Sequence, residues 1–169
     1  FKSRLLPQTE NFPVTLVFYS SITLDSSLKK AEYPELTFGN RMGYFTQLIV
    51  SRKFSNALSL IISPTFFHEN LVIFDAQKNS QYGLCFGGRY KLSKRLSLNF
   101  DYGHHFNRAD ESNFNNPLGI GVDIETGGHV FQLLFSNSQP MNSINAMTSA
   151  SGDWIDGDVY FGFNLFRTF

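Results

Sequence analysis

The sequence has no long run of apolar residues. A membrane-spanning helix needs about 18 to 20 consecutive apolar residues, and no run in the 169 residues approaches that length. Residues 1–20 also lack the basic-then-apolar pattern of a signal peptide. The composition therefore excludes a membrane-spanning helix within these residues.

Neither sign of charge is in excess, and cysteine is almost lacking. Lys and Arg together number 14, as do Asp and Glu, so no global basic field attracts nucleic acid. The lone Cys85 cannot form an internal disulfide and has no nearby Cys or His at metal-ligand spacing. We interpret it as a small buried side chain. Glycine-rich phosphate loops between a strand and a helix are also lacking, and we expect no cofactor.

Aromatic residues in an alternating pattern are what the sequence has in abundance. The 19 Phe and 7 Tyr raise the aromatic content to 16%, while the mean hydropathy is only −0.15. In RLSLNFDYG, residues 95–103, apolar and polar residues alternate at every position. The stretches NALSLIISPTFF, YGLCFGGRYKL and PLGIGVDIE repeat this pattern. A period of two residues is typical of a strand with one apolar and one polar face.

The alternation predicts an all-β chain of about nine strands with no long amphipathic helix. Besides the four stretches above, strands are expected at residues 1–6, 14–24, 39–53, 129–137 and 159–169. The length suits one domain, residues 1–169.

The connections between the expected strands are sorted by length. Tight turns lie at KFSNA, LSKR and ETGGH, whereas long polar links lie at residues 25–37, 69–79, 107–116 and 138–156. Short turns at one rim and long loops at the other are typical of an outer-membrane barrel. The segments SRKFSNALSL and GRYKLSKRLSL also share one plan, a basic strand end followed by a turn and a Leu-Ser-Leu start.

Alternation alone leaves two architectures open, because the apolar face could pack on a second sheet or meet lipid. The apolar side is rich in rings, and the polar side carries small residues and charges, among them Gly43, Gly83 and Gly87. These features favour a transmembrane antiparallel up-and-down barrel over a soluble β-sandwich. Tyrosines near the strand ends could form interfacial girdles: Tyr44, Tyr82, Tyr90, Tyr102 and Tyr160.

The stretch VYFGFNLFRTF ends the sequence on an alternating strand. One face of this strand carries Phe161, Phe163, Leu165 and Phe169. The stretch resembles the carboxy-terminal signal by which the barrel assembly machinery recognises outer-membrane barrels. An ordinary last strand of a sandwich is the alternative interpretation.

The stretches GVDIETGGHVFQLLFSNSQPMN and GDWIDGDVYFGFNLFRTF resemble the end of an uncharacterised family of outer-membrane β-barrel proteins of Bacteroidota. RKFSNALSLIISPTFFHENL and GGRYKLSKRLSLNFDY resemble the family's middle hairpins, so that the resemblance runs over residues 12–169. It implies a barrel in the outer membrane of a Gram-negative bacterium, with about three more strands before FKSRLLP and about twelve in total. The 169 residues are then the carboxy-terminal portion of a larger barrel. The family carries no established activity.

Charges of both signs fall on the polar faces of the expected strands and are predicted to face the lumen: Arg41, Arg89, Asp101, Asp123 and Glu125. In a narrow barrel such groups pair across the interior, and in a wider one they select solutes. Asp123, Glu125 and His129 also flank the ETGGH turn. They could titrate as one coupled group, but a salt-bridge network with Arg89, Lys91 or Arg95 is the simpler interpretation.

A metal or acid–base site can be imagined at His104 and His105, next to Asp101. Adjacent residues of a strand point to opposite faces, so only His105 shares the side of Asp101. A solvated strand end is the simpler interpretation of these residues, and we predict no metal site.

No serine sits in a glycine-framed elbow, and no Ser–His spacing stands out, so we expect no catalytic activity. The leading hypothesis is a porin-like or transport barrel in contact with outer-membrane lipid. The alternative is a scaffold barrel with a blocked lumen, which protein partners of an envelope complex grip through residues 25–37 and 138–156. Trp154 would then serve as an anchor at a protein contact or at the lipid interface.

Overall fold

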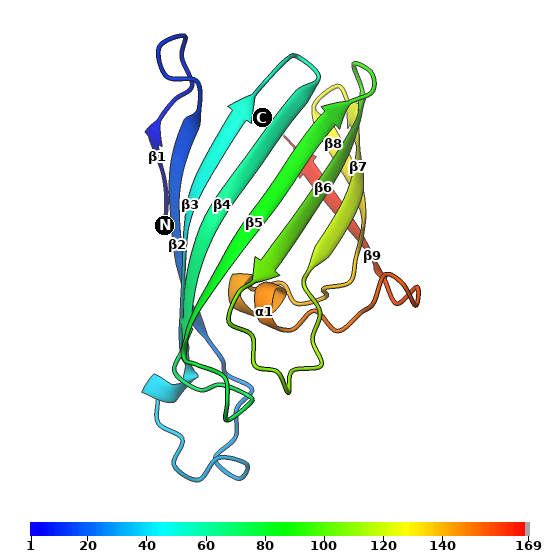
Figure 1. The fold of residues 1–169 in the computed structure, drawn as a ribbon. Helices are drawn as coiled ribbons and strands as arrows, with labels where there is room; N and C mark the ends of the chain where they lie inside the picture. The colour runs from blue at the N-terminus through cyan, green and yellow to red at the C-terminus, as the bar shows by residue number, and fades with distance from the viewer. Residues whose placement is uncertain (168–169) are drawn as a thin grey trace.

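In a computed structural model of the chain, residues 1–167 are described, and they form nine strands and two short helices (Figure 1). The strands are β1 (Lys2–Leu6), β2 (Thr15–Leu24), β3 (Met42–Lys53), β4 (Leu58–Glu69), β5 (Ser80–Lys91), β6 (Leu96–His105), β7 (Leu118–Thr126), β8 (His129–Ser136) and β9 (Tyr160–Arg167). The 3-10 helix η1 (Gly39–Arg41) precedes β3, and α1 (Ser143–Thr148) lies between β8 and β9. The all-β prediction with about nine strands is confirmed.

All nine strands belong to one antiparallel sheet in which sequence neighbours are also neighbours in space. The β2–β3 register, for example, runs without a break from the pair Thr15 and Ser51 to the pair Leu24 and Met42. Because the described residues form a single up-and-down sheet, the sandwich alternative is wrong. Among these residues, no helix has the length and apolarity that a membrane crossing requires.

The predicted sorting of the connections is confirmed. Short turns join β3 to β4, β5 to β6 and β7 to β8 at one end of the sheet, and the long connections lie at the other end (Figure 1). The β7–β8 turn is made by Gly127 and Gly128, whose φ angles are 53° and 121°. Glycine adopts these positive values without the strain that a Cβ would cause.

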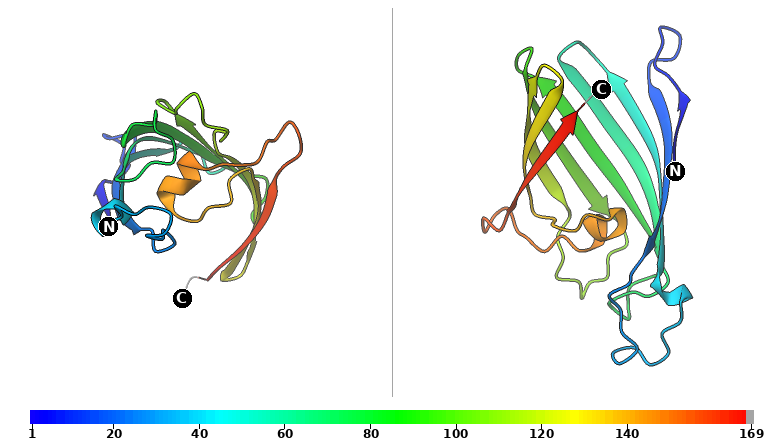
Figure 2. Two further views of the ribbon diagram at one scale, coloured as in Figure 1. Left: turned by 90° about the horizontal axis from the view of Figure 1, so that it is seen from below. Right: turned by 180° about the vertical axis from the view of Figure 1, so that it is seen from behind.

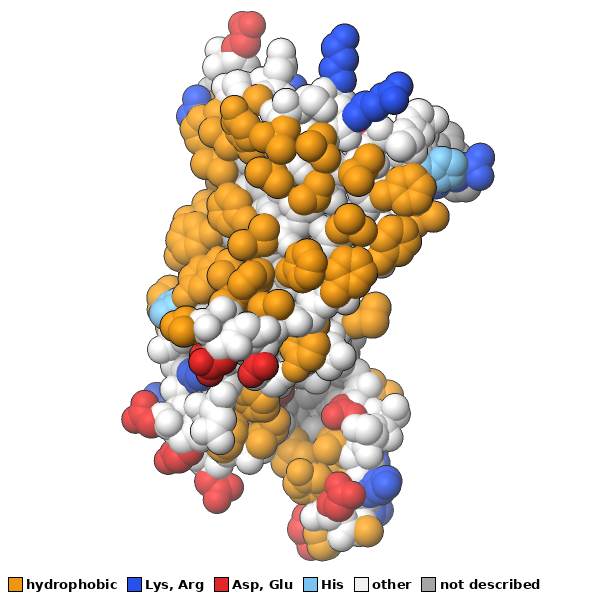
Figure 3. All heavy atoms as spheres, turned by 90° about the vertical axis from the view of Figure 1, so that its right-hand side faces the viewer, with side chains coloured by type: hydrophobic (Ala, Val, Ile, Leu, Met, Phe, Trp, Pro, Cys, Tyr) orange, Lys and Arg blue, Asp and Glu red, His pale blue; other side chains and the backbone are white. Residues whose placement is uncertain are grey.

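The two faces of the sheet differ in chemistry. Large apolar side chains alternate onto the outer face, for example Phe86 on β5 and Phe100 on β6. Figure 3 shows such side chains as a band over the strands on one side of the molecule. The inner face carries small or polar residues, among them the buried Ser63, Gln81 and Ser97. The period-two pattern of the sequence therefore corresponds to two distinct environments.

The hydrophobic core is small and lies on the inner, concave face. It consists of Phe45, Phe67, Ile144 and Met147. The remaining large apolar residues are mostly exposed on the outside. A soluble protein rarely exposes so extensive an apolar band.

The sheet curves strongly, and its first and last strands form two edges. β1 pairs with β2 and β9 with β8, and the described residues contain no β1–β9 pairing. Seen along the sheet, the strands form an incomplete cylinder with α1 inside it (Figure 2). The shape is that of a barrel wall that the described strands do not close.

Candidate functional site

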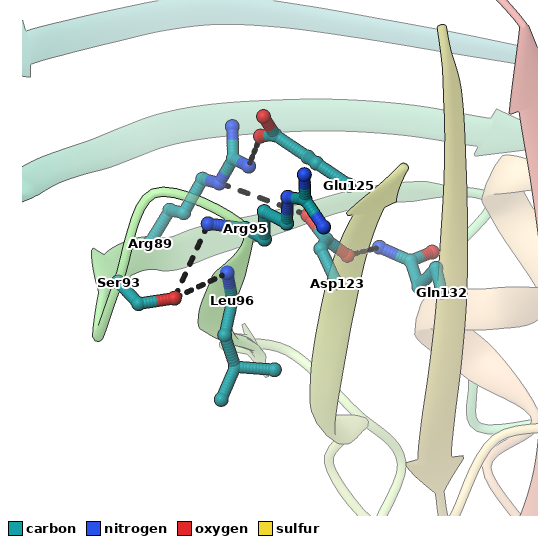
Figure 4. Close-up of polar contacts among 7 residues, drawn as sticks. All are labelled: Arg89, Ser93, Arg95, Leu96, Asp123, Glu125 and Gln132. Carbon is teal, nitrogen blue, oxygen red and sulfur yellow. Dashed lines mark hydrogen bonds and ion pairs between the residues drawn. The ribbon is translucent and has the colours of Figure 1, made fainter. Parts of the chain in front are cut away.

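A row of polar side chains crosses the inner face near the short-turn end, from β5 through β7 and β8 to β9. Figure 4 shows its part from Arg89 to Gln132. Arg89 Nη2 donates to Glu125 Oε1 at 2.5 Å, and Arg89 Nε lies 3.7 Å from Asp123 Oδ2. Gln132 Nε2 donates to Asp123 Oδ1 at 2.8 Å, and Asn164 Nδ2 donates to Gln132 Oε1 at 2.9 Å. The row ties four strands together and pairs both carboxylates with one cation.

Three of the five predicted lumen charges thus meet in one network, and Arg89 is the partner of both acids. Asp101 is also on the inner side but stands apart, opposite Gly119 of β7. Arg41 lies in η1 at the long-loop end, where its Nη1 donates to the carbonyl of Asp25 at 3.0 Å.

His129 points to the outer face, because it pairs with Thr126 and its ring lies 6.5 Å from that of Phe131 two residues away. The coupled group of Asp123, Glu125 and His129 therefore does not form. Of these three residues, only Asp123 and Glu125 lie on the inner side.

The most prominent feature of the interior is the β8–β9 connection, residues 137–159, which we call the inner loop. It folds back against the concave face and places α1 there (Figure 2). Ile144 and Met147 of α1 are buried against Phe45 and Phe67. The sequence reasoning missed this helix.

Three glycines on the inner face make room for α1, and we call them the glycine seat: Gly43, Gly83 and Gly103. A Cβ at Gly43 would lie 2.5 Å from Ile144 Cδ1. A Cβ at Gly103 would lie 2.6 Å from Met147 Sδ, and a Cβ at Gly83 would lie 2.8 Å from Met147 Cε. A larger residue at these positions would therefore require the side chain of Ile144 or Met147 to shift.

Arg108, in the β6–β7 connection, holds the carboxy-terminal end of α1. Its Nη1 donates to the carbonyl of Thr148 at 2.9 Å, and its Nη2 donates to those of Met147 at 3.0 Å and Asn115 at 3.1 Å. A cation at this end of a helix satisfies unpaired carbonyls and complements the helix dipole. At the other end, Asn142 Oδ1 accepts from the amide of Asn145 at 2.8 Å.

Further bonds fix the rest of the inner loop to its neighbours. The buried Asn137 accepts from the amide of Leu118 at 2.7 Å and donates to the carbonyl of Asn116 at 3.0 Å. Asn115 forms a β-bridge with Ala150. Trp154 Nε1 donates to the carbonyl of Leu118 at 3.0 Å, so this side chain contributes to internal structure.

Two cavities flank α1. One, of about 340 Å³, is lined by Gly43, Glu69, Ile144 and residues of the β2–β3 connection. The other, of about 360 Å³, is lined by Asp101, Met147 and other inner-face residues. The helix therefore divides the interior at the long-loop end without filling it.

A third cavity, of about 20 Å³, lies beside α1 among Glu69, Gln81, His105 and Arg108. His105 is buried, and its ring centre lies 5.1 Å from that of Phe67. As predicted, His105 and Asp101 share the inner face, whereas His104 lies on the outer face beside Tyr102. Among the described residues, no group of three or more His, Cys, Asp or Glu could hold a metal ion.

The proposed assembly signal lies on β9. Phe161, Phe163 and Leu165 face outward, and each pairs across the strand with an apolar residue of β8. The rings of Phe161 and Phe135 are 5.4 Å apart. Phe169 lies outside the described residues.

A family model described as a membrane bound beta barrel domain (DUF5777) matches residues 1–169. Comparison with curated proteins gave no match, and neither did comparison with solved structures.

Proposed function

The chain belongs to this family of membrane-bound β-barrel domains (DUF5777), and from this premise we propose that it is a porin-like barrel of the outer membrane with a lumen narrowed by the inner loop. The expected setting is a Gram-negative bacterium of the Bacteroidota. The outward band of apolar side chains supports a lipid-facing exterior. Tyr44, Tyr82 and Tyr102 lie on the outer face near the long-loop end, where rings with a polar tip suit a membrane interface.

We propose that further strands close the barrel between β9 and β1. In hydrocarbon, each unpaired backbone group of an open edge costs several kcal/mol, and β1 and β9 each present such an edge. Single-chain bacterial barrels have an even number of strands, so the nine strands require an odd number of additional strands to close the barrel. About three more strands would give a total of about twelve.

The two cavities beside α1 are the observation that supports a conducting lumen. An eight-stranded barrel is filled by its own side chains, whereas barrels of 16 or more strands leave a channel. A barrel of intermediate size with a helix inside it is narrowed but not filled, because cavities of about 340 Å³ and 360 Å³ flank α1. The inner loop would then set the width of the pore.

We also propose that the protein is not an enzyme. The acids near the short-turn end are engaged by Arg89 and Gln132, which leaves no free acid–base pair in that network. A solute would therefore meet paired charges that affect its passage.

Single-channel recording in a planar bilayer tests the proposed function. We expect the full-length protein to conduct, and replacement of residues 140–151 by a short Gly-Ser linker to raise the conductance, because α1 then leaves the lumen. Current from the linker variant with none from the wild type would favour a blocked barrel. Absence of current from both would remove the channel proposal.

The blocked scaffold remains the second candidate, and it is favoured by the bonds that hold α1 in place through Arg108. In that case a protein partner should co-purify in mild detergent and be lost when residues 141–152 are deleted. Retention of the partner by the deletion variant would argue against a contact through the inner loop.

A further inference from the structure

The net charge of zero conceals a separation of charge along the barrel axis. Nine of the 14 acidic residues lie in the four long connections: Asp25, Glu32, Glu35, Asp75, Asp110, Glu111, Asp153, Asp156 and Asp158. At the opposite end, five cations occupy two short turns and the adjoining strand ends: Arg52, Lys53, Lys91, Lys94 and Arg95. We call these five residues the basic rim. Figure 3 shows Lys and Arg above the apolar band, and below it most of the visible Asp and Glu together with further Lys and Arg.

The two turns of the basic rim are built alike. In the β3–β4 turn, Ser55 Oγ accepts from the amides of Ala57 at 3.1 Å and Leu58 at 3.0 Å. In the β5–β6 turn, Ser93 Oγ accepts from the amides of Arg95 at 3.2 Å and Leu96 at 3.1 Å (Figure 4). This common construction explains the shared plan of the two sequence segments.

The two turns are also joined to each other and to the next hairpin. The amide of Lys91 donates to the carbonyl of Ala57 at 2.8 Å, and the amide of Glu125 donates to that of Arg95 at 2.8 Å. The cations therefore stand on one continuous, hydrogen-bonded edge. A fixed edge presents them to a ligand without a large loss of backbone entropy.

All five cations of the basic rim are exposed, and none of them forms an ion pair with another described residue. The nearby acids Asp123 and Glu125 are already engaged by Arg89. Each turn also carries one exposed apolar residue, Phe54 or Leu92. The guanidinium carbon of Arg52 lies 4.9 Å from the ring centre of Phe54.

From this arrangement we infer that the basic rim binds the head groups of anionic phospholipids. Arg52 shares the outer face and lies beside Phe54 at the border of the lipid-facing band, whereas the exposed Lys53 and Lys91 stand at strand ends in register with the inner-face residues Ser59 and Ser97. Exposed cations at such a border, beside an apolar residue, match a surface whose phosphates lie next to acyl chains. Phe54 and Leu92 favour a lipid over a free anion, because a soluble phosphate offers them no apolar partner. The inference depends on the proposed membrane-spanning barrel and adds a lipid preference to it.

Native mass spectrometry of the full-length protein in mild detergent tests this inference. With phosphatidylglycerol and phosphatidylcholine supplied in equal amounts, we expect phosphatidylglycerol to be retained preferentially. Because each cation near an anionic surface contributes about a fivefold gain in binding, replacing all five with Gln should abolish the preference. The matched variant K29Q/K30Q/K78Q, which removes cations from the long-loop end, should keep it.

Two further measurements distinguish binding of a lipid from binding of free phosphate and from a nonspecific effect of positive charge. Excess inorganic phosphate at constant ionic strength should leave the bound lipid in place, and F54S/L92S should weaken retention although all five cations remain. Displacement by phosphate, equal retention of both lipids by the wild type, or an unchanged preference in the five-Gln variant would each overturn the inference.

Heat-modifiable migration and insertion into phosphatidylcholine vesicles serve as the folding controls for every variant. If the wild type inserts into neutral vesicles but shows no lipid preference, the lipid inference alone fails. If the wild type does not insert at all, the proposed barrel function fails with it.

Discussion

At the scale of single residues, Arg108 shows how one side chain can fix a whole segment. Its guanidinium donates to three backbone carbonyls, two of which belong to the end of α1. Hydrogen bonds to charged groups contribute about 1.5–3 kcal/mol each. A residue of the β6–β7 connection therefore contributes to holding the inner loop against the sheet.

The variant Arg108→Met should loosen α1 while leaving the sheet intact. We expect faster amide hydrogen exchange over residues 143–148, corresponding to a local loss of about 2–3 kcal/mol. Lys78→Met, which removes a cation from the adjacent β4–β5 connection, is the control and should change nothing. Equal protection of α1 in both variants would show that the apolar contacts alone hold the helix.

Ser27 has a comparable local effect on Asp25. The pKa of Asp25 lies below its usual value, chiefly because the Ser27 hydroxyl donates to Asp25 Oδ1 at 2.6 Å. A carboxyl group with a lowered pKa stabilises the folded loop above the unfolded pKa of about 3.9, and this stabilisation is lost as the pH falls through the folded pKa.

Ser27→Ala should therefore raise the pKa of Asp25, so that the carboxyl group takes up its proton at a higher pH than in the wild type. A carboxyl ¹³C NMR titration measures this directly. Ser26→Ala, at the neighbouring exposed position, should leave the titration unchanged. If both variants titrate like the wild type, the hydroxyl of Ser27 is not the cause.

At the scale of elements, α1 and the glycine seat are complementary in shape. A six-residue helix is too short to be stable alone, so its helical form depends on the sheet beneath it. Gly43 and Gly103 are especially informative, because an added Cβ would meet side chains of α1 before any backbone atom. Substitution there acts on the contact with the helix and spares the strand ladder.

The double variant Gly43→Val/Gly103→Val should displace α1 and raise the channel conductance. Gly87→Val is the control. Gly87 is also an inner-face glycine, but a Cβ there would lie 2.9 Å from Ile61 Cγ1 and would not contact α1. Valine suits strands, so all variants should fold. Unchanged conductance with normal folding would mean that α1 does not limit the flow.

The strands could be predicted from the sequence, but the inner loop could not. Alternation in β5 and β6 is a local property of the sequence. It predicts that these segments are strands, and it predicts the face of the sheet on which Phe86 and Phe100 lie. The position of α1 depends on glycines far away in the chain. The available signals were weak: Asn142 as a helix cap, and Ile144 and Met147 three residues apart. Arg89 was among the three cations predicted as partners of Asp123, because alternation places both residues on the same face of the sheet, two strands apart.

At the scale of the whole molecule, the environment of the outer face is decisive. Phe100 is exposed near the middle of β6, and Thr126 is exposed at the β7–β8 turn. Arginine costs about 2–4 kcal/mol at the centre of a bilayer and about 0–1 kcal/mol near its surface. On a water-facing surface, a substitution usually changes stability by less than about 0.5 kcal/mol.

Phe100→Arg should therefore destabilise the protein by about 2–4 kcal/mol in lipid vesicles, and Thr126→Arg by less than about 1 kcal/mol. Denaturant titration of the vesicle-inserted protein gives both values. Similar small losses for the two variants would indicate that the outer face is not in contact with hydrocarbon.

The position of α1 in the chain has a consequence for the order of assembly. α1 follows β8, whereas its seat is formed by β3, β5 and β6. Contacts between such distant segments form late, since the intervening chain must first be ordered. The helix can dock only after these strands have paired in the correct register. A sheet with a slipped register would align no glycines under Ile144 and Met147, and its β8–β9 connection would stay outside, open to proteolysis. We therefore expect docking of α1 to depend on the correct pairing of β3, β5 and β6.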